Sequence, residues 1–330
     1  MGRGTILVTG GAGYIGSHVV LQLRERGESV VVLDDLSRGF RQSVGPTPLV
    51  VGDIGDRALV TGLLREHDVE TVMHFAAFTI VPESVRDPLK YYANNVCGTR
   101  NLLQCCAEAG VRHFVFSSSA AVYGTPAGDL AAEDSPTAPI NSYGTSKLVS
   151  EWMLRDLALA SELRYVALRY FNVAGSDMGG RIGQATPGAT LLIKVASEAI
   201  VGKRPHVSIF GTDYPTPDGT GIRDYIHVED LAGAHLAAVD YLRRAGASTV
   251  LNCGYGHGYS VRQVLDSVQR VSGQRLNIKE EPRRAGDPAV LVAKADRIRS
   301  LLSWSPKLDD LDTIVRSSLD WEAKLLREPW

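Results

Sequence analysis

An apolar run at residues 5–9 leads straight into the glycine-rich segment GGAGYIG at 10–16, and a helical pattern follows it. Gly10, Gly13 and Gly16 have GxxGxxG spacing. Glycines at such a strand-to-helix turn permit a tight bend and the close approach of a phosphate. The free N–H groups at the helix start also favour a pyrophosphate. The segment therefore predicts a nucleotide-binding turn, although a glycine-rich turn without a ligand has the same pattern.

The first half of the chain alternates short apolar runs with amphipathic stretches. Strands are predicted at 5–9, 29–34, 48–52, 69–75, 112–117 and 164–170. Helices are predicted near 14–26, 56–66, 88–109 and 143–160. This alternation favours a parallel sheet with helices on both faces, and continuous apolar strands fit burial on both sides. The predicted fold class is α/β, with a doubly wound parallel sheet of the Rossmann type.

The pattern changes after about residue 173. Residues 175–188 and 211–223 are rich in Gly, Ser, Thr or Pro and are predicted as loops. A helix is predicted from about 260, where Ser260 and Gln263 fit a capping box, and another near 309–326. We expect a nucleotide-binding domain at 1–174 and a smaller mixed α/β domain at 175–330. The chain is expected to return to the first domain around 224–258.

Composition narrows the class of protein. The chain has 330 residues, 44% of them hydrophobic, and a formal net charge of −2. We expect a soluble, cytoplasmic globular protein, since no apolar run approaches the roughly 20 residues of a membrane span and no signal peptide is visible. The absence of basic runs argues against nucleic acid. Cys97, Cys105, Cys106 and Cys253 lack CxxC spacing, so buried reduced thiols are expected, with no metal site.

Two acids end the second predicted strand. Asp34 lies 18 residues beyond Gly16, where an acid accepts hydrogen bonds from an adenosine ribose. Asp35 adds a negative charge that repels a 2′-phosphate, so NAD is favoured over NADP. Arg38 is the counter-argument, because an arginine can accept that phosphate. We interpret Arg38 as a surface charge.

The third and fourth predicted strands end in residues of the same kind of site. Asp53 and Ile54 end the third strand and are placed to reach the adenine, although Asp53 equally fits the start of a helix. Phe75, Ala76 and Ala77 follow the fourth strand. The small side chains of Ala76 and Ala77 allow the backbone to approach a cofactor.

Tyr143 and Lys147 stand four residues apart in the run YGTSK, at the start of a predicted helix. On a helix these positions share one face. A phenol has an ordinary pKa of about 10, and a fixed cation nearby lowers it. The pair therefore fits an acid/base role, although alone it equally fits a packed tyrosine and a solvated lysine. The serines at 117–119 end the fifth predicted strand and face the same ligand crevice.

In this order, the glycine turn, the acid after the second strand, the serines and YxxxK resemble the extended short-chain dehydrogenase/reductase family. The matching segments are TGGAGYIGSH at 9–18, FSSSAAVYG at 116–124 and YGTSK at 143–147. Further segments are similar to the UDP-glucose 4-epimerases within that family. They are ALRYFNVAG at 167–175, IFGTDYPTPDGTGIRDYIHVEDLA at 209–232 and PRRAGDPA at 282–289. The resemblance extends over essentially the whole chain.

The resemblance implies an isomerase that interconverts UDP-glucose and UDP-galactose. Tyr143 would take the proton of the sugar 4-hydroxyl, and Ser119 would relay it. Lys147 would lower the pKa of Tyr143 and hold the nicotinamide ribose. The C4 hydride would move to tightly bound NAD, leaving a transient 4-keto sugar, and would return to its other face. NAD would thus be regenerated in each turnover.

The resemblance also implies the binding residues. Cofactor contacts would come from Gly10, Gly13, Tyr14, Ile15, Gly16, Asp34, Asp35, Ser37, Asp53, Ile54, Phe75, Ala76, Ala77, Thr79, Asn94, Ser117, Tyr143, Lys147 and Phe171. Substrate contacts would come from Ser119, Tyr143, Asn172, Leu191, Leu192, Ile209, Phe210, Arg223, Tyr225, Arg284, Asp287 and Leu291. The two arginines would pair with the phosphates and Asp287 with the uridine ribose. Taken alone, these arginines equally fit surface ion pairs.

Five positions narrow the chemistry within the family. Thr79 replaces a lysine of some members, and Leu191 an asparagine or histidine. Leu291 stands where some members have a tyrosine and others a cysteine, and these members differ in whether they accept N-acetylated sugars. Whether the chain interconverts UDP-GlcNAc and UDP-GalNAc therefore stays open. Ala120 and Ala121 stand where sugar dehydratases and decarboxylases carry acids, so neither of those reactions is expected.

Two rival functions remain. One is a 4-epimerase for another UDP-sugar, such as a pentose or a uronate. The other is a nucleotide-sugar-binding protein without turnover. The resemblance further implies a homodimer through the helices near 88–109 and 143–160, although their apolar stripes are equally explained by packing within one chain.

Overall fold

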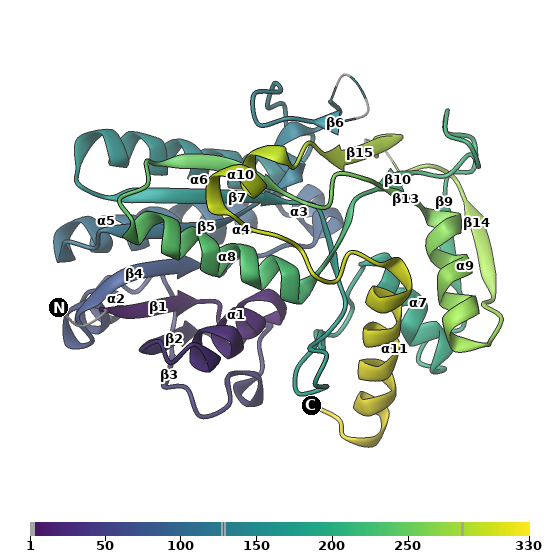
Figure 1. Ribbon diagram of the computed structural model, residues 1–330, viewed down its shortest axis with the longest axis horizontal. Helices are drawn as coiled ribbons and strands as arrows, with labels where there is room; N and C mark the ends of the chain where they lie inside the picture. Colours follow the sequence, from purple (N-terminus) through teal and green to yellow (C-terminus); the bar gives the residue numbers. More distant parts are fainter. Residues whose placement is uncertain (1–3, 127, 129, 285–286) are drawn as a thin grey trace.

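The structure, a computed structural model, describes residues 4–126, 128, 130–284 and 287–330 (Figure 1). Its centre is a parallel sheet of seven strands in the order β3-β2-β1-β4-β5-β7-β12. These strands are β1 (Thr5–Thr9), β2 (Val30–Asp34), β3 (Leu49–Val51), β4 (Val69–His74), β5 (His113–Ser119), β7 (Arg164–Tyr170) and β12 (Thr249–Cys253). The predicted doubly wound parallel sheet is confirmed.

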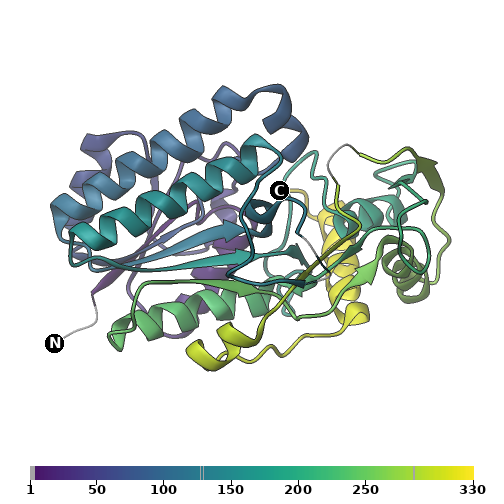
Figure 2. The ribbon, with the colours of Figure 1, turned by 90° about the horizontal axis from the view of Figure 1, so that it is seen from above.

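Helices cover both faces of this sheet because its strands are apolar on both sides. Along β1, Ile6 and Val8 belong to one buried cluster and Leu7 to another, as alternating side chains require. One face is covered by α1 (Tyr14–Glu25) and α8 (Val228–Arg243). The other is covered by α2 (Arg57–Glu66), α5 (Thr99–Ala109) and α6 (Ser142–Ala160) (Figure 2).

The strand order changes direction beside β1, which has β2 on one side and β4 on the other. Ligands of such sheets bind at the carboxyl ends of the strands, at this switch point. Gly10 follows β1, and Phe75 follows β4 and donates its N–H to the carbonyl of Thr9 at 2.8 Å. The two predicted cofactor segments therefore lie next to each other.

Beyond the carboxyl ends of the central strands lies a second group of elements (Figure 1). Helices α7 (Leu192–Ile200), α9 (Val261–Ser272) and α11 (Leu311–Arg327) pack on one another, beside the paired strands β9 (Val207–Phe210) and β14 (Ile278–Glu281). The predicted capping box is present, since Ser260 and Gln263 exchange hydrogen bonds of 3.1 and 2.8 Å. A four-stranded sheet joins β13 (Tyr259–Ser260), β10 (Ile222–Arg223), β15 (Val290–Ala293) and β6 (Leu130–Ala131).

The remaining elements are short. They are η1 (Arg41–Val44), α3 (Val81–Arg86), α4 (Pro88–Tyr91), η3 (Ala120–Tyr123), β8 (Asn172–Ala174), β11 (Tyr225–His227) and α10 (Asp296–Leu302). From the segment 224–258, β12 joins the central sheet and β11 pairs with β8. One detail differs from the prediction. The predicted helix at 88–109 contains the π-helical segment η2 (Tyr92–Gly98) between α4 and α5.

All four cysteines are free, but Cys97 is exposed, unlike the other three. Within the described residues, no group of His, Cys, Asp and Glu is arranged to hold a metal. No helix in those ranges is long and apolar enough to cross a lipid bilayer. Of the segment 282–289, Ala285 and Gly286 lie outside the described residues.

Candidate active site

The glycine-rich turn packs so closely against neighbouring backbone that Gly10 and Gly16 have no room for a side chain. Gly10 has a φ of +71°, and a Cβ there would lie 2.4 Å from the backbone nitrogen of Ala76. A Cβ on Gly16 would lie 2.3 Å from the carbonyl oxygen of Gly10. Helix α1 starts at Tyr14 after Gly13, without a side-chain cap. The first N–H groups of α1 are therefore directed at a space suited to an anion.

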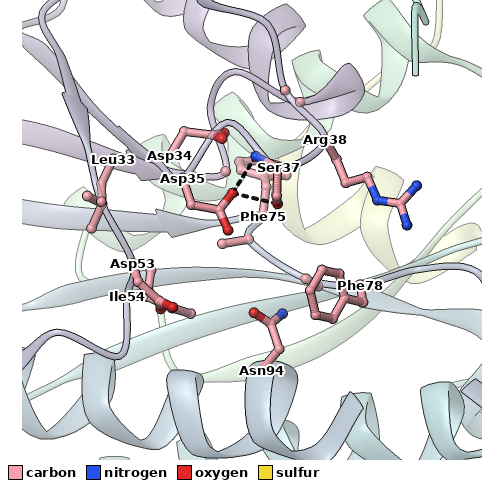
Figure 3. Close-up of a pocket in the computed structure, with 16 residues that line it drawn as sticks. Leu33, Asp34, Asp35, Ser37, Arg38, Asp53, Ile54, Phe75, Phe78 and Asn94 are labelled. Carbon is pink, nitrogen blue, oxygen red and sulfur yellow. Dashed lines mark hydrogen bonds between the residues drawn. The ribbon is translucent and has the colours of Figure 1, made fainter. Parts of the chain in front are cut away.

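Two acids mark one end of the groove above this turn (Figure 3). The carboxylate of Asp34 accepts hydrogen bonds from the backbone N–H groups of Ala12 at 2.9 Å and Leu36 at 2.8 Å. Burial raises the pKa of Asp34, and these two donors oppose the increase. Asp35 accepts from the N–H and the hydroxyl of Ser37 at 2.9 and 2.6 Å. Both carboxylates are thus held in place at the end of β2.

This end of the groove gathers most of the predicted cofactor residues. Those that line it are Gly10, Gly13, Asp34, Asp35, Ser37, Asp53, Ile54, Phe75, Ala76, Ala77 and Asn94. Arg38, interpreted from sequence as a surface charge, also lines it. Its guanidinium lies 3.9 Å from the carboxylate of Glu83, and its side chain is 42% exposed.

Helix α6 meets the end of β5 at close range. Asn141 caps α6 by accepting the N–H of Gly144 at 2.9 Å. A Cβ on Gly144 would lie 2.5 Å from the carbonyl oxygen of Ala121, so glycine allows the helix start to approach the segment after β5. This approach brings Tyr143 of α6 beside Ser119 of β5, and both side chains line the same groove.

Lys147 lies one helical turn beyond Tyr143 and is only 3% exposed. Its ammonium donates a hydrogen bond of 2.9 Å to the carbonyl oxygen of Ser117 and lies 5.0 Å from the ring centre of Phe116. The lysine is therefore anchored to the end of β5, behind the groove wall.

The expected lowering of the Tyr143 pKa by Lys147 is not found in the protein chain itself. Burial raises the pKa of Tyr143, and the hydroxyl of Ser119 opposes this increase. Burial also lowers the pKa of Lys147 to about 7, against the opposing charge of Glu151. In this apolar setting both groups favour their neutral forms, so a phenolate at Tyr143 needs a further positive charge beside it.

The middle of the groove joins the turn to the catalytic candidates. The predicted residues that line it are Gly10, Gly13, Tyr14, Ile15, Gly16, Phe75, Ala77, Thr79, Ser117, Ser119, Tyr143, Phe171, Asn172, Leu191 and Leu291. Phe78, Gln184 and Thr190 also line it and were not predicted. Gly10, Gly13, Phe75 and Ala77 line both the first and the middle part, so the groove is continuous there.

The far end of the groove holds the predicted substrate residues. Those that line it are Asn172, Leu191, Leu192, Phe210, Arg223, Tyr225, Arg284 and Asp287. Arg223 pairs with Asp287 at 2.7 Å, and the guanidinium of Arg284 lies 3.7 Å from the ring centre of Phe210. Asn172 and Leu191 line both this end and the middle part, so these parts also connect.

Two predicted residues line none of these three parts. Lys147 is one of them, since it lies behind Tyr143 and Ser117. The other is Ile209, which is 1% exposed and belongs to the core. Because side chains alternate along a strand, β9 directs Ile209 inward and its neighbour Phe210 to the groove.

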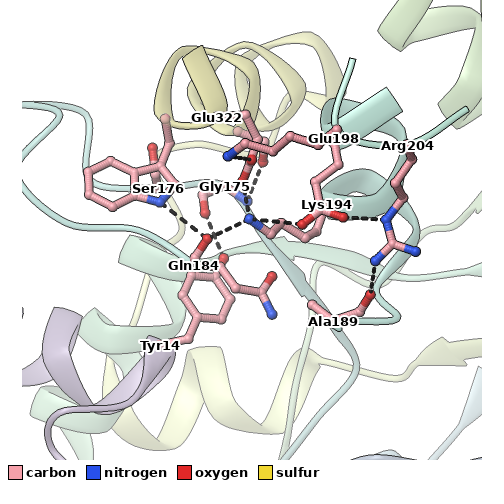
Figure 4. A network of polar contacts seen from close by, with 12 residues as sticks. Tyr14, Gly175, Ser176, Gln184, Ala189, Lys194, Glu198, Arg204 and Glu322 are labelled. Atoms are coloured by element: carbon pink, nitrogen blue, oxygen red, sulfur yellow. Dashed lines mark hydrogen bonds and ion pairs between the residues drawn. The ribbon is translucent and has the colours of Figure 1, made fainter. Parts of the chain in front are cut away.

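A buried charge network supports the groove segment between Gln184 and Ala189 (Figure 4). The ammonium of Lys194 pairs with Glu322 of α11 and donates to the carbonyl of Gln184 at 2.9 Å. Arg204 donates to the carbonyl of Ala189 at 3.0 Å. Sequence reasoning missed this network. Its signal in the sequence is a lysine within the otherwise apolar start of α7.

The chain matches the NAD dependent epimerase/dehydratase family over residues 6–254. It belongs to that family. The UDP-glucose 4-epimerase of Azospirillum brasilense is 57% identical over 321 residues, which are 97% of this chain and 92% of that protein. A crystal structure of UDP-glucose 4-epimerase from Brucella ovis with NAD has a TM-score of 0.94 and 44% identity, covering 96% of this chain and 98% of its own. The UDP-Glc/GlcNAc 4-epimerase of Campylobacter jejuni has a TM-score of 0.86 and 48% identity, covering 98% and 100%.

NAD is the cofactor of the chain as a member of this family. The residues present fit it. The turn at Gly10 and Gly16 leaves a cradle that a Cβ would fill, next to the start of α1, where a diphosphate is favoured. Asp34 and Asp35 place two carboxylates in the groove at the end of β2, where they would accept ribose hydroxyls and would disfavour a further phosphate.

Proposed function

We propose that this protein is a UDP-glucose/UDP-galactose 4-epimerase, an isomerase that inverts the configuration at C4 of the hexose. Ser119 and Tyr143 stand midway along one continuous groove, and this arrangement is the main support. The glycine-rich turn lies at one end, suited to NAD. Arg223 and Arg284 lie at the other, suited to the diphosphate of a UDP-sugar.

Tyr143 is the proton carrier in this proposal. As a phenolate, Tyr143 takes the proton of the sugar 4-hydroxyl, and as the resulting phenol it later returns that proton, while Ser119 orients the same sugar oxygen. Bound NAD supplies the acceptor, and on return the donor, of the C4 hydride. With a pKa near 7, Lys147 is able to gain or lose its charge near neutral pH. In its charged form Lys147 adds to the positive charge that favours a phenolate at Tyr143, beside the further positive charge that the phenolate needs.

The arginines at the far end hold the nucleotide part of the substrate. Arg223 now pairs with Asp287, and Arg284 stacks on Phe210. A diphosphate offers both guanidinium groups charge-assisted, bidentate hydrogen bonds. Substrate binding is therefore expected to redirect both arginines and to leave Asp287 free for a ribose hydroxyl.

The residues after Ser119 limit the chemistry further. Ala120 and Ala121 line the groove beside Tyr143 and carry no ionisable group. Elimination of water or loss of carbon dioxide from a sugar needs an additional acid or base at the reacting carbons. A reversible hydride transfer needs only one proton carrier, which Tyr143 provides.

The proposed function is tested by incubating the purified protein with UDP-galactose, without added cofactor, and following the anomeric protons by NMR. We expect UDP-glucose to form, and Tyr143→Phe to lose nearly all turnover. Normal turnover in Tyr143→Phe would overturn the assignment. Product only from a UDP-pentose or UDP-uronate would favour the first rival. Retention of NAD and UDP-sugar for hours without product would favour a binding protein.

The residue at position 291 favours a second pair of substrates, UDP-GalNAc and UDP-GlcNAc. Leu291 lines the middle of the groove together with Tyr143 and Leu191. A leucine leaves more room than a tyrosine would, so the N-acetyl group of UDP-GalNAc has space there. We therefore propose slower exchange of UDP-GalNAc and UDP-GlcNAc, measured by the same NMR experiment. No exchange in Leu291→Ala, with UDP-galactose still converted, would argue against this role of the position.

We also propose the oligomeric state and the domain division expected from the sequence. A homodimer through the helices near 88–109 and 143–160 is supported by Leu89, Trp152 and Leu159, which are 75, 47 and 84% exposed.

Residues 1–174 would form the NAD-binding domain and 175–330 the UDP-sugar-binding domain, with α8 and β12 returning to the first. A cytoplasmic location agrees with the four free cysteines.

A further inference from the structure

A buried ion pair lies directly beneath the catalytic candidates. Arg169 of β7 contacts Glu151 of α6 through two hydrogen bonds, of 2.9 and 2.6 Å, and their side chains are only 7 and 4% exposed. A buried ion pair gives little net stability compared with well-packed apolar side chains of the same volume. Stability alone is therefore a weak reason for a pair at this place.

The pair is attached to the end of β5 through Ser118. The hydroxyl of Ser118 donates to the same Glu151 carboxylate at 2.5 Å. Ser118 is also the register partner of Arg169 across the β5–β7 pair. On either side of it in the chain stand Ser117, which accepts from Lys147, and Ser119, which meets Tyr143. The position of both catalytic contacts therefore depends on how Ser118 is held.

The same carboxylate is fixed on the helix that carries the reacting groups. Tyr143, Lys147 and Glu151 follow one another at intervals of four residues along α6, so they share one helix face. Glu151 thus links the strand end to the helix behind the groove wall. Arg169 completes the anchor by donating a further bond of 3.0 Å to the hydroxyl of Tyr123.

Glu151 also acts on the charge of Lys147. Burial lowers the pKa of Lys147, and the negative charge of Glu151 opposes this. His74 of β4 also faces Lys147, and it is neutral near pH 7 because burial lowers its pKa to about 3. Around Glu151 itself stand Arg169 and the phenols of Tyr123 and Tyr165.

We propose that Glu151 and Arg169 are positioning residues for the reaction: as a pair they fix the end of β5 against α6, where the proton-handling groups meet. The inference rests on the proposed function, because it concerns the rate of that reaction. Its test is therefore run only after the wild-type protein has been assayed. Absence of turnover in the wild type overturns the proposed function and not the placement of the pair.

Three variants separate positioning from stability. Ser118→Ala removes only the hydroxyl link, Glu151→Gln removes the anion, and Glu151→Met with Arg169→Met replaces the whole pair by apolar groups. For each we would measure retained NAD, the thermal midpoint, kcat and KM for UDP-galactose, and the pH profile of kcat. Glu28→Gln is the control, since Glu28 pairs with Arg243 at 2.9 Å in a buried site before β2, away from the groove.

We expect the double variant to keep its fold and its NAD but to lose roughly a hundredfold in kcat, with KM changed by less than about twofold. Ser118→Ala should lose roughly tenfold in kcat with an unchanged pH profile. In Glu151→Gln and the double variant the alkaline limb should move to lower pH, because Lys147 loses its proton more easily. Glu28→Gln should change the thermal midpoint alone.

Wild-type kcat and pH profile in the double variant would overturn the proposal, because the pair would then serve stability only. If the double variant does not fold, the kcat and thermal midpoint of Ser118→Ala test the proposal instead. A kcat of Ser118→Ala equal to that of the wild type would overturn the proposal, and the expected loss at unchanged thermal midpoint would support it.

Discussion

The lysine of the YxxxK pair shows how burial and function oppose each other at a single residue. The ammonium of Lys147 is removed from water and donates to one backbone carbonyl, that of Ser117. A charged amine in such a place is costly, so the folded chain favours the neutral form and the pKa falls to about 7. Near neutral pH the amine of Lys147 is therefore able to exist with or without its charge.

This cost predicts how stability depends on pH. The pKa of Lys147 is about 7 in the folded chain, against an ordinary value of 10.5. Between these values the unfolded chain binds the proton and the folded chain does not, so stability rises with pH across this window. In Lys147→Met the free energy of unfolding should not rise with pH in this way. The variant should therefore exceed the wild type in unfolding free energy most below pH 7, and the difference should shrink toward pH 10.5.

Urea unfolding at a series of pH values checks this sign, with the wild type measured in parallel. Curves of unfolding free energy that stay parallel for the wild type and Lys147→Met would show that the lysine is not neutralised by folding. A smaller advantage of the variant at low pH than at high pH would show that the sign is wrong.

The glycines of the cradle give a second prediction at the residue scale. In Gly16→Ala the new Cβ would meet the carbonyl oxygen of Gly10 at 2.3 Å, and this backbone cannot give way cheaply. We expect a loss of about 1–3 kcal/mol in stability and purification without bound NAD. Gly62→Ala is the matched control, because Gly62 is a helical glycine of α2 with nothing within 4 Å of a Cβ. That change should stabilise the protein by about 0.5–1 kcal/mol.

At the scale of elements, periodic segments were predictable and short or paired ones were not. The strands and helices of the central sheet carry repeated apolar patterns, and they lie within a few residues of their predicted bounds. Strands such as β10 and β13 contain only two residues, too few for any pattern. The pairing of β11 with β8 depends on tertiary contacts that no local sequence encodes.

The site shows the same division. The glycine turn, Asp34 and Tyr143 follow from local motifs. The charge network of Lys194 and Glu322 does not, because it joins residues 128 positions apart on α7 and α11. The direction of the pKa of Tyr143 also depends on burial, which only the assembled fold reveals.

That network gives a prediction for the elements it joins. Glu322 is 1% exposed and faces two ammonium groups, those of Lys194 and Lys203. Glu322→Gln should cost about 3–5 kcal/mol, because it removes the buried anion that faces the buried ammonium of Lys194. Glu280→Gln, which breaks an exposed pair with Arg262, should cost less than about 1 kcal/mol. Urea unfolding of both variants tests this, and equal losses would show that the buried network is not more important than a surface pair.

At the scale of the whole molecule, one groove connects two groups of elements. The central sheet supplies the cradle, the acids and the catalytic candidates, whereas the segments around β9 and β10 supply the arginines. The segment between Gln184 and Ala189 bridges them and is held by hydrogen bonds from α7, from α11 and from Arg204. The reaction site therefore needs both halves folded against each other.

The outer helices give the last prediction. On α6, Tyr143 and Lys147 are buried, whereas Trp152 and Leu159, seven residues apart, are exposed on the same outward face. Helix α6 lies beside α5 (Figure 2). Large apolar side chains gathered on one face mark an interaction surface. If that surface joins two copies of the chain, a charge placed there should separate them. We expect Trp152→Glu combined with Leu159→Glu to convert a dimer into a monomer in light scattering at micromolar concentration.

The matched control is Leu326→Glu on α11, where a leucine is 51% exposed but stands apart from these helices. It should leave the dimer intact. Both proteins should keep their NAD, because neither change touches the groove, so a loss of mass with NAD retained separates dissociation from unfolding. A dimer that survives the double change would place the contact elsewhere, and a wild-type monomer would mean that these side chains are simply exposed.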